Sequence, residues 1–379
     1  SVKAVLAAVD SNFSSTMKSC SDTAERLRST ISSGLGFGAM AAIGGKAVTA
    51  VGSALKGVTT NAVSAGMSFE STMSSVAALS GATGSDFDKL SDKAKQLGAS
   101  TKYTSSQIAS AMEYMSMAGW KADEMLSGMD DVINLTIASG GDLARATDIV
   151  TDALTAFGKQ AKDSGEFADV LATASANANT NVDLMGETFK YVGSVAGAMG
   201  YSIQDIALAT SIMANSSIKG SAAGTALRAT ITRMAKPTEE SSMAMSALGL
   251  SLTDANGNMN SFAQIMKDMR KGMQGLTEDE KASYAAMLGG QEAMSGLLAI
   301  VNASDEDFNK LSDAINNASG AAETMASIKA DNLQGAVDEL KSGIEGIGIT
   351  AFEQAKGKLK EFVKNITSEI SDANKKLAD

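Results

Sequence analysis

The sequence predicts an all-α protein: a multi-helix core domain with one small β-hairpin, flanked by extended coiled-coil-like helices. Only one proline, Pro237, occurs in 379 residues, and proline is the residue that most readily ends a helix. Apolar residues recur at steps of three and four in both terminal arms and after the helix starts of the middle. Aromatic residues make up 4% of a chain that is 44% hydrophobic, so the core must consist of Ala, Leu, Ile, Val and Met.

The N-terminal arm, residues 1–68, carries a helical seam. Apolar residues follow one another at steps of three and four, as a coiled coil presents them to partner helices. The seam positions proposed for oligomer contacts are Leu6, Val9, Phe13, Leu27 and Ile31. The same spacing also suits an ordinary amphipathic helix packed on the chain's own core, and the two interpretations stay open for either arm.

Residues 29–69 of this arm are poor in charge and rich in small residues. Lys46 and Lys56 are their only charged residues, and Gly34 and Gly38 have the spacing that lets two helices approach closely. We expect a small-residue helix packed against copies of itself. A membrane-active segment and a flexible linker are the alternatives.

Repeated helix-start signals in the middle, residues 69–345, predict many short helices. The net charge of residues 70–350 is −15, whereas the whole chain carries −11, because both ends are slightly basic. Helix starts are expected where Ser or Thr precedes an acid or amide by three residues, the capping-box pattern. Seven pairs fit: Ser85/Asp88, Thr104/Gln107, Thr180/Asp183, Ser202/Asp205, Ser261/Gln264, Thr277/Glu280 and Ser304/Asp307. No repeat period of 20–50 residues is visible, so a solenoid is not expected.

Residues 250–259 break the helical pattern. Leu250 and Leu252 alternate with polar residues, and Asp254 to Gly257 supplies turn chemistry, so we expect a small β-hairpin. Asp254, Asn256 and Asn258 also match the start of a calcium loop, but the match fails at Met259 and Ile265. A solvated turn is the better interpretation.

The C-terminal arm, residues 346–379, repeats the seam of the N-terminal arm. Its proposed oligomer-contact positions are Leu359, Val363, Ile366, Ile370 and Leu377. Matching seams on both sides of an acidic middle favour rods flanking a globule, and self-association as a homo-oligomer, with a trimer favoured.

The composition excludes several classes of site. The chain has no His and a single Cys, Cys20, which removes His-based triads and His- or Cys-built metal sites. We therefore expect no catalytic, cofactor-binding or metal site and no cofactor. The net charge of −11 argues against binding of nucleic acid through its phosphates. Because the chain begins at Ser1, we expect it to be processed or partial.

Several long blocks of the middle, in fixed order, resemble the core region of phage tail tape measure proteins. They include FESTMSSVAALSGAT from Phe69, LGASTKYTSSQIASAMEYMSMAGW ending at Trp120, FADVLATASANANTNVDLMGETFKYV ending at Val192 and SIMANSSIKGSAAGTALRATITRMAKPT ending at Thr238. The resemblance covers roughly 69–345. The two arms are similar to the family only in character.

The resemblance implies a structural role in the virion. A tape measure protein lies in the lumen of the tail tube, templates tail assembly and length, and leaves ahead of the DNA at infection. The implied partners are the tail tube protein, tail tip or baseplate hub proteins and tail assembly chaperones, with host membrane contact during ejection. The implied locations are the phage tail and, during assembly, the host cytoplasm. The family core has no catalytic residues, so no enzyme activity is expected.

Two other functions stay open at this point. Residues 29–69 would form a membrane channel or DNA conduit if that segment inserts into the host membrane. A peptidoglycan-acting tail enzyme is the second alternative, although no aromatic platform for a sugar stands out around the single Trp, Trp120.

Overall fold

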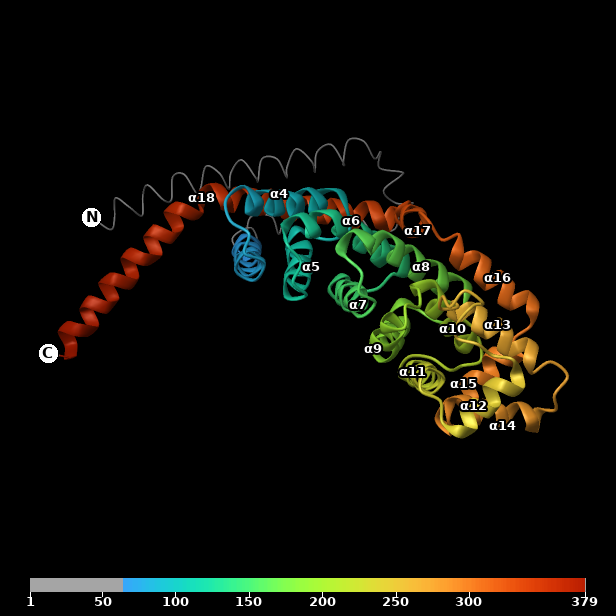
Figure 1. Cartoon of the computed structure of the whole chain (residues 1–379). Helices are drawn as coiled ribbons and strands as arrows, with labels where there is room; N and C mark the ends of the chain where they lie inside the picture. Colours follow the sequence, from blue (N-terminus) through green and yellow to red (C-terminus); the bar gives the residue numbers. More distant parts are fainter. Residues whose placement is uncertain (1–63, 379) are drawn as a thin grey trace, which may run out of the picture. The chain divides into compact units, whose positions relative to one another are not determined.

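The computed structural model describes residues 64–378, and those residues are helical, with no β-strand among them (Figure 1). The all-α class is therefore confirmed. The helices are 64–80, α4 (Ser85–Ser100), α5 (Ser105–Met117), α6 (Ala122–Ser139), α7 (Leu143–Ala156), the 3-10 turn η1 (Ala161–Asp163), α8 (Ser164–Asn177), α9 (Val182–Ala198), α10 (Ile203–Asn215), α11 (Ser221–Ala235), α12 (Glu239–Leu248), α13 (Phe262–Gly272), α14 (Glu278–Gly289), α15 (Gln291–Asn302), α16 (Asp305–Asn316), α17 (Ala321–Ala330) and α18 (Leu333–Ala378).

The described residues form two compact units. One consists of residues 64–113 together with 330–378, and the other of Tyr114–Lys329. The division of the sequence into 1–68, 69–345 and 346–379 stays a prediction. Most of its first part lies outside the described residues.

In the first unit, the N-terminal part of α18 packs along α4. Polar contacts join elements that are far apart in sequence: Lys95 pairs with Glu353 at 3.2 Å, and Ser106 donates a hydrogen bond to Glu345 at 2.8 Å. Phe352 is buried against the helix 64–80, where Gly66 leaves room for its ring. The start of the long helix is thus fixed to this unit by side-chain packing.

The second unit is built from helices that pack on their next-but-one neighbours. Helices α6, α8 and α10 make one layer, and α7, α9 and α11 make the other; the latter are seen nearly end-on in Figure 1. Helices α12 to α16 complete the unit by packing against α10, α11 and one another. The layered packing does not require a repeated sequence, because each helix needs only an apolar face that it can bury against its neighbours.

The core of this unit contains many methionines, as the scarcity of aromatic residues predicts. Met115, Met266, Met269 and Met273 are fully buried. Their unbranched side chains fill the irregular gaps between crossing helices where aromatic residues are scarce.

Most of the predicted helix starts are confirmed. Reciprocal capping boxes form at Ser202 and Thr277, and at Thr104, whose N–H donates to Gln107 at 2.9 Å. Ser261 and Ser304 cap α13 and α16 through their side-chain oxygens, without the reciprocal hydrogen bond from the third residue to the cap N–H.

Two helix starts are wrong by one residue. Helix α9 is capped by Asn181 rather than Thr180, since the Asn181 side chain accepts a hydrogen bond from the Leu184 N–H and Asn is a better N-cap than Thr. Helix α4 begins at Ser85 itself, after Gly84, which supplies no side-chain cap.

The expected β-hairpin at 250–259 is wrong. Only an isolated antiparallel bridge between Thr253 and Met259 forms there. The Leu250 N–H still donates to the carbonyl oxygen of Met245 in the last turn of α12, so too few residues remain for a ladder. The Asp254 carboxylate takes the N–H groups of Asn256 and Asn258 at 2.8 and 2.9 Å, which closes the loop locally.

Asp254 lies in an exposed turn, as expected, and its carboxylate is bound by the turn's own hydrogen bonds. Hydrogen bonds from the Asn258 side chain and backbone hold the pKa of the Asp254 carboxyl below its usual value. In the part of the chain that the structure describes, no cluster of His, Cys, Asp and Glu could hold a metal ion.

A buried carboxylate joins α10 to α13. Asp205, 5% exposed, accepts the Ala263 N–H at 2.9 Å with one oxygen and the Ser202 N–H at 3.1 Å with the other. Next to it, the Tyr201 ring packs on Phe262 with 5.3 Å between centroids. Burial, and then the Asp205 charge, raise the pKa of Tyr201 to about 12. Asp205 therefore accepts hydrogen bonds from backbone N–H groups at the starts of two helices, α10 and α13.

Candidate functional site

Helix α18 is the longest element of the described chain. It runs for 46 residues without interruption, which corresponds to about 69 Å at the usual rise per residue. The C-terminal seam positions Leu359, Val363, Ile366, Ile370 and Leu377 all lie on this helix. They follow Phe352, which is still buried in the first unit.

The N-terminal seam positions Leu6, Val9, Phe13, Leu27 and Ile31 lie outside the described residues. Oligomer contacts along the two seams therefore stay a prediction. Residues 29–63 of the candidate membrane segment lie outside the described part as well. Within the described part, none of the helices combines the length and the apolar character needed to cross a membrane.

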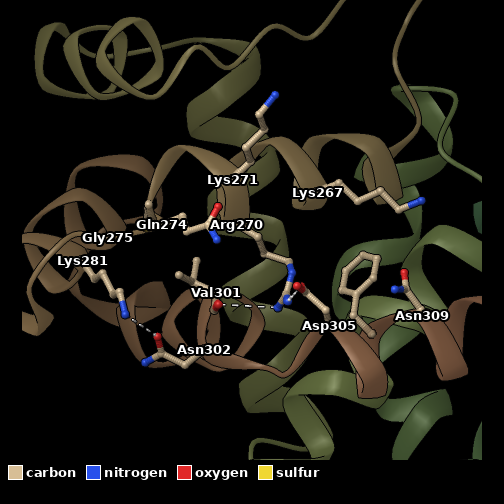
Figure 2. Close-up of a pocket in the computed structure, with 12 residues that line it drawn as sticks. Lys267, Arg270, Lys271, Gln274, Gly275, Lys281, Val301, Asn302, Asp305 and Asn309 are labelled. Carbon is tan, nitrogen blue, oxygen red and sulfur yellow. Dashed lines mark hydrogen bonds and ion pairs between the residues drawn. The ribbon is translucent and has the colours of Figure 1, made fainter.

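A basic pocket opens between α13, α14, α15 and α16 in the second unit (Figure 2). Its volume is about 460 Å³. Its charged lining residues are Lys267, Arg270, Lys271, Lys281 and Asp305, so four cations face one carboxylate. This excess of positive charge is opposite in sign to the net charge of the surrounding residues 70–350.

Helix α13 supplies most of this charge because of its spacing. Phe262, Ile265 and Met269 are buried on one side of the helix. Lys267, Arg270 and Lys271 lie at i, i+3 and i+4, which places them on a common face. The basic face of α13 therefore becomes one wall of the pocket once the apolar face is buried.

Arg270 is fixed at the centre of the pocket (Figure 2). Its guanidinium donates to the carbonyl oxygens of Ile300 at 2.8 Å and Ala303 at 2.6 Å, and it pairs with Asp305 at 2.6 Å. The group also lies 5.0 Å from the centroid of the Phe308 ring. Arg270 thus satisfies the free carbonyls at the end of α15 and ties α13 to α15 and α16.

Lys281 is held in the same way on the α14 side. Its ammonium group contacts Glu278 at 2.8 Å and the side-chain oxygen of Asn302 at 3.2 Å. Only 18% of the side chain is exposed. Arg270 and Lys281 therefore have structural partners for their charges.

Lys267 and Lys271 differ from these two cations. Neither makes an ion pair with another described residue, and the Lys267 ammonium lies 6.0 Å from the centroid of the Phe308 ring. In Figure 2, the Lys267 side chain extends toward Asn309, whereas the Lys271 side chain points away from Arg270. Both lysines belong to the lining of the pocket, and neither charge is balanced by an ion pair with another described residue.

The sequence analysis did not predict this pocket. The available signal was three basic residues within one turn of α13 in an acidic region. That signal alone is also typical of a solvated helix end, where cations favour the C-terminal dipole. Asp305 and Phe308 become relevant only when α16 packs beside α13.

Comparison with known proteins identifies the family. The phage-related minor tail protein family matches residues 91–290. The tape measure protein of Pneumococcus phage Dp-1 is 35% identical over 94% of this chain and 31% of its own length. The probable tape measure protein of Escherichia phage P2 is 26% identical over 74% of this chain and 35% of its own. This chain belongs to the phage tail tape measure family.

The family assignment makes the chain a structural component of a phage tail, as the resemblance implied. A probable tape measure protein of Clostridium phage phiCD119 is also similar, at 22% identity over 87% of this chain. The chain spans about a third of the length of these curated relatives. No solved structure matches it significantly.

Within this tape measure chain, the family match and the structural features only partly coincide. The matched range includes Lys267, Arg270, Lys271 and Lys281 of the basic pocket. It ends before α16, which supplies Asp305, and before α18 with its seam positions.

Proposed function

We propose that this chain lies in the lumen of the tail tube, where it helps to template tail assembly and to set tail length, and that it leaves ahead of the DNA at infection. The observation that supports this role is the uninterrupted helix α18, which extends from a compact unit. A helix converts residues into length at a constant rise, whereas a folded unit does not. Tail tube, tip or hub proteins and assembly chaperones are its proposed partners.

Shortening α18 should shorten the tail. Deleting three heptads from 356–376 in the phage's own tape measure gene removes about 30 Å of helix. We expect the mean tail length in electron micrographs to fall in whole tube rings, because tube subunits add as complete rings.

A matched insertion tests whether tail length follows the length of the extended helix rather than the number of residues in the chain. A heptad inserted between Asp254 and Gly257 enters an exposed turn of the second unit, so it should be absorbed without a change in tail length. If the turn insertion changes tail length by as much as the α18 deletion does, the division into rod and globule is wrong.

The seam on α18 should also join copies of the chain. We propose a homo-oligomer, most simply a trimer, held by Leu359, Val363, Ile366, Ile370 and Leu377 with their N-terminal counterparts. Apolar residues at steps of three and four along a 46-residue helix support it.

Charges placed on the seam test this assembly. The double variant Ile366→Asp and Ile370→Asp should lower the mass of the purified chain in light scattering to that of a monomer, because a buried seam does not tolerate unpaired carboxylates. Lys360→Asp and Lys364→Asp change exposed positions of the same helix and serve as the control. An unchanged mass in the first variant would show that this seam does not drive assembly.

A further inference from the structure

We propose that the basic pocket docks an acidic peptide segment of another protein, whose carboxylates pair with Lys267 and Lys271. The argument begins with the charge of the pocket. Four cations and one carboxylate line a cavity of about 460 Å³, a volume that holds one or two peptide side chains. The cavity lies in a region of net negative charge, so the cations are not part of a generally basic surface.

The two lysines start from neighbouring positions on one face of α13, and their side chains point in different directions in the free protein. Because a lysine side chain is flexible, both ammonium groups can turn to one doubly charged ligand. The two residues lie at i and i+4 of α13, where neighbouring side chains start about 6 Å apart. Two like charges at this spacing repel each other in the free protein. A pair of carboxylates from one peptide would remove that repulsion and gain two charge-assisted hydrogen bonds.

The wall behind the lysines is already ordered. Arg270 is held by two carbonyl oxygens and Asp305, and only 11% of its side chain is exposed. Arg270 is therefore a fixed part of the wall, and Asp305 balances its charge, so the unpaired positive charge of the pocket is that of Lys267 and Lys271. The side chains of Gln274 and Asn309 also line the pocket, and both offer amide N–H donors.

The rim favours a peptide over a nucleic acid. Exposed acids occupy the first turns of both flanking helices, with Glu278, Asp279 and Glu280 on α14 and Asp305, Glu306 and Asp307 on α16. Duplex DNA carries a charge about every 1.7 Å, so its neighbouring phosphates would meet these carboxylates. A peptide can place two carboxylates in the pocket and leave neutral residues at the rim.

Fluorescence anisotropy with the purified chain tests the proposal. The probe is a short labelled peptide with two Glu residues separated by one Ala and flanked by neutral residues, and its neutral counterpart has Gln at both Glu positions. The Glu peptide should bind, and the double variant Lys267→Gln and Lys271→Gln should weaken its binding at least about tenfold. The double variant Lys360→Gln and Lys364→Gln removes two exposed lysines at the same spacing on α18 and should leave binding unchanged.

Three results would overturn the proposal. Equal weakening by both double variants would mean that only net charge matters. Equal binding of the Glu and Gln peptides, including no binding of either, would show that the pocket does not recognise carboxylates. Tighter binding of an oligonucleotide with the same net charge as the Glu peptide would assign the pocket to nucleic acid. Circular dichroism verifies that each variant is folded before binding is compared.

Discussion

Replacing Asp205 with alanine is expected to lower the free energy of unfolding of the Tyr114–Lys329 unit by about 3 kcal/mol. The carboxylate is buried and accepts two backbone N–H groups, one from Ser202 and one from Ala263 at the start of α13. Alanine would leave both donors without this partner, and it would remove the link between two helices that are 58 residues apart in sequence.

Urea unfolding followed by tryptophan fluorescence measures this effect. Trp120 is the only Trp of the chain and is buried within the same unit, so its emission reports on that unit. Asp205→Asn keeps one carbonyl oxygen as an acceptor and should lose about half as much stability. Asp313→Ala, at an exposed position of α16, should change stability by less than about 0.5 kcal/mol. A loss no larger in Asp205→Ala than in this control would contradict the role of the carboxylate.

The second large effect is expected at Gly224, where α11 crosses α9. A Cβ atom added there would lie 2.6 Å from the Thr188 carbonyl oxygen and 2.7 Å from the Tyr191 Cβ. Both contacts involve atoms that cannot rotate away, so the helices would have to separate. We expect Gly224→Ala to lower the stability of the unit by about 2 kcal/mol, and Gly224→Val to lower it further.

The same substitution at Gly343 should act in the opposite direction. Gly343 lies inside α18 with open space around the position of a Cβ atom. Alanine there should stabilise the helix by up to about 1 kcal/mol, because it is the better helix former. Far-UV circular dichroism during urea unfolding follows this variant, since the first unit contains no Trp. Unchanged stability in Gly224→Ala would contradict the close approach of α9 and α11. Destabilisation by Gly343→Ala would contradict the open space around Gly343.

Features that depend on neighbouring residues were predicted well from the sequence. Ser202 and Thr277 begin helices with capping boxes because a cap needs only the next three residues. The misplacement at Thr180 has the same origin, since Asn181 competes for the same helix start. The all-α class also follows from local properties, namely a single proline and apolar periodicity.

The loop at 250–259 shows the limit of such local reasoning. Alternating residues and turn chemistry are compatible with a hairpin, but the Asp254 side chain and the end of α12 take the backbone groups that a ladder would need. Which partner a backbone group takes depends on the helix that precedes the loop. The pattern of the ten residues could not show this.

The sequence by itself determined the helical class, most helix starts and the resemblance to tape measure proteins, because each depends on residues that are close together in the chain or in a fixed order. Only the tertiary structure decided that α6 to α11 stack in two layers, that Asp205 meets the start of α13, and that a basic pocket forms. Arg270 and Asp305 illustrate the reason. They are 35 residues apart and meet only because the apolar faces of α13, α15 and α16 pack together, and burial of those faces fixes where the charged side chains lie.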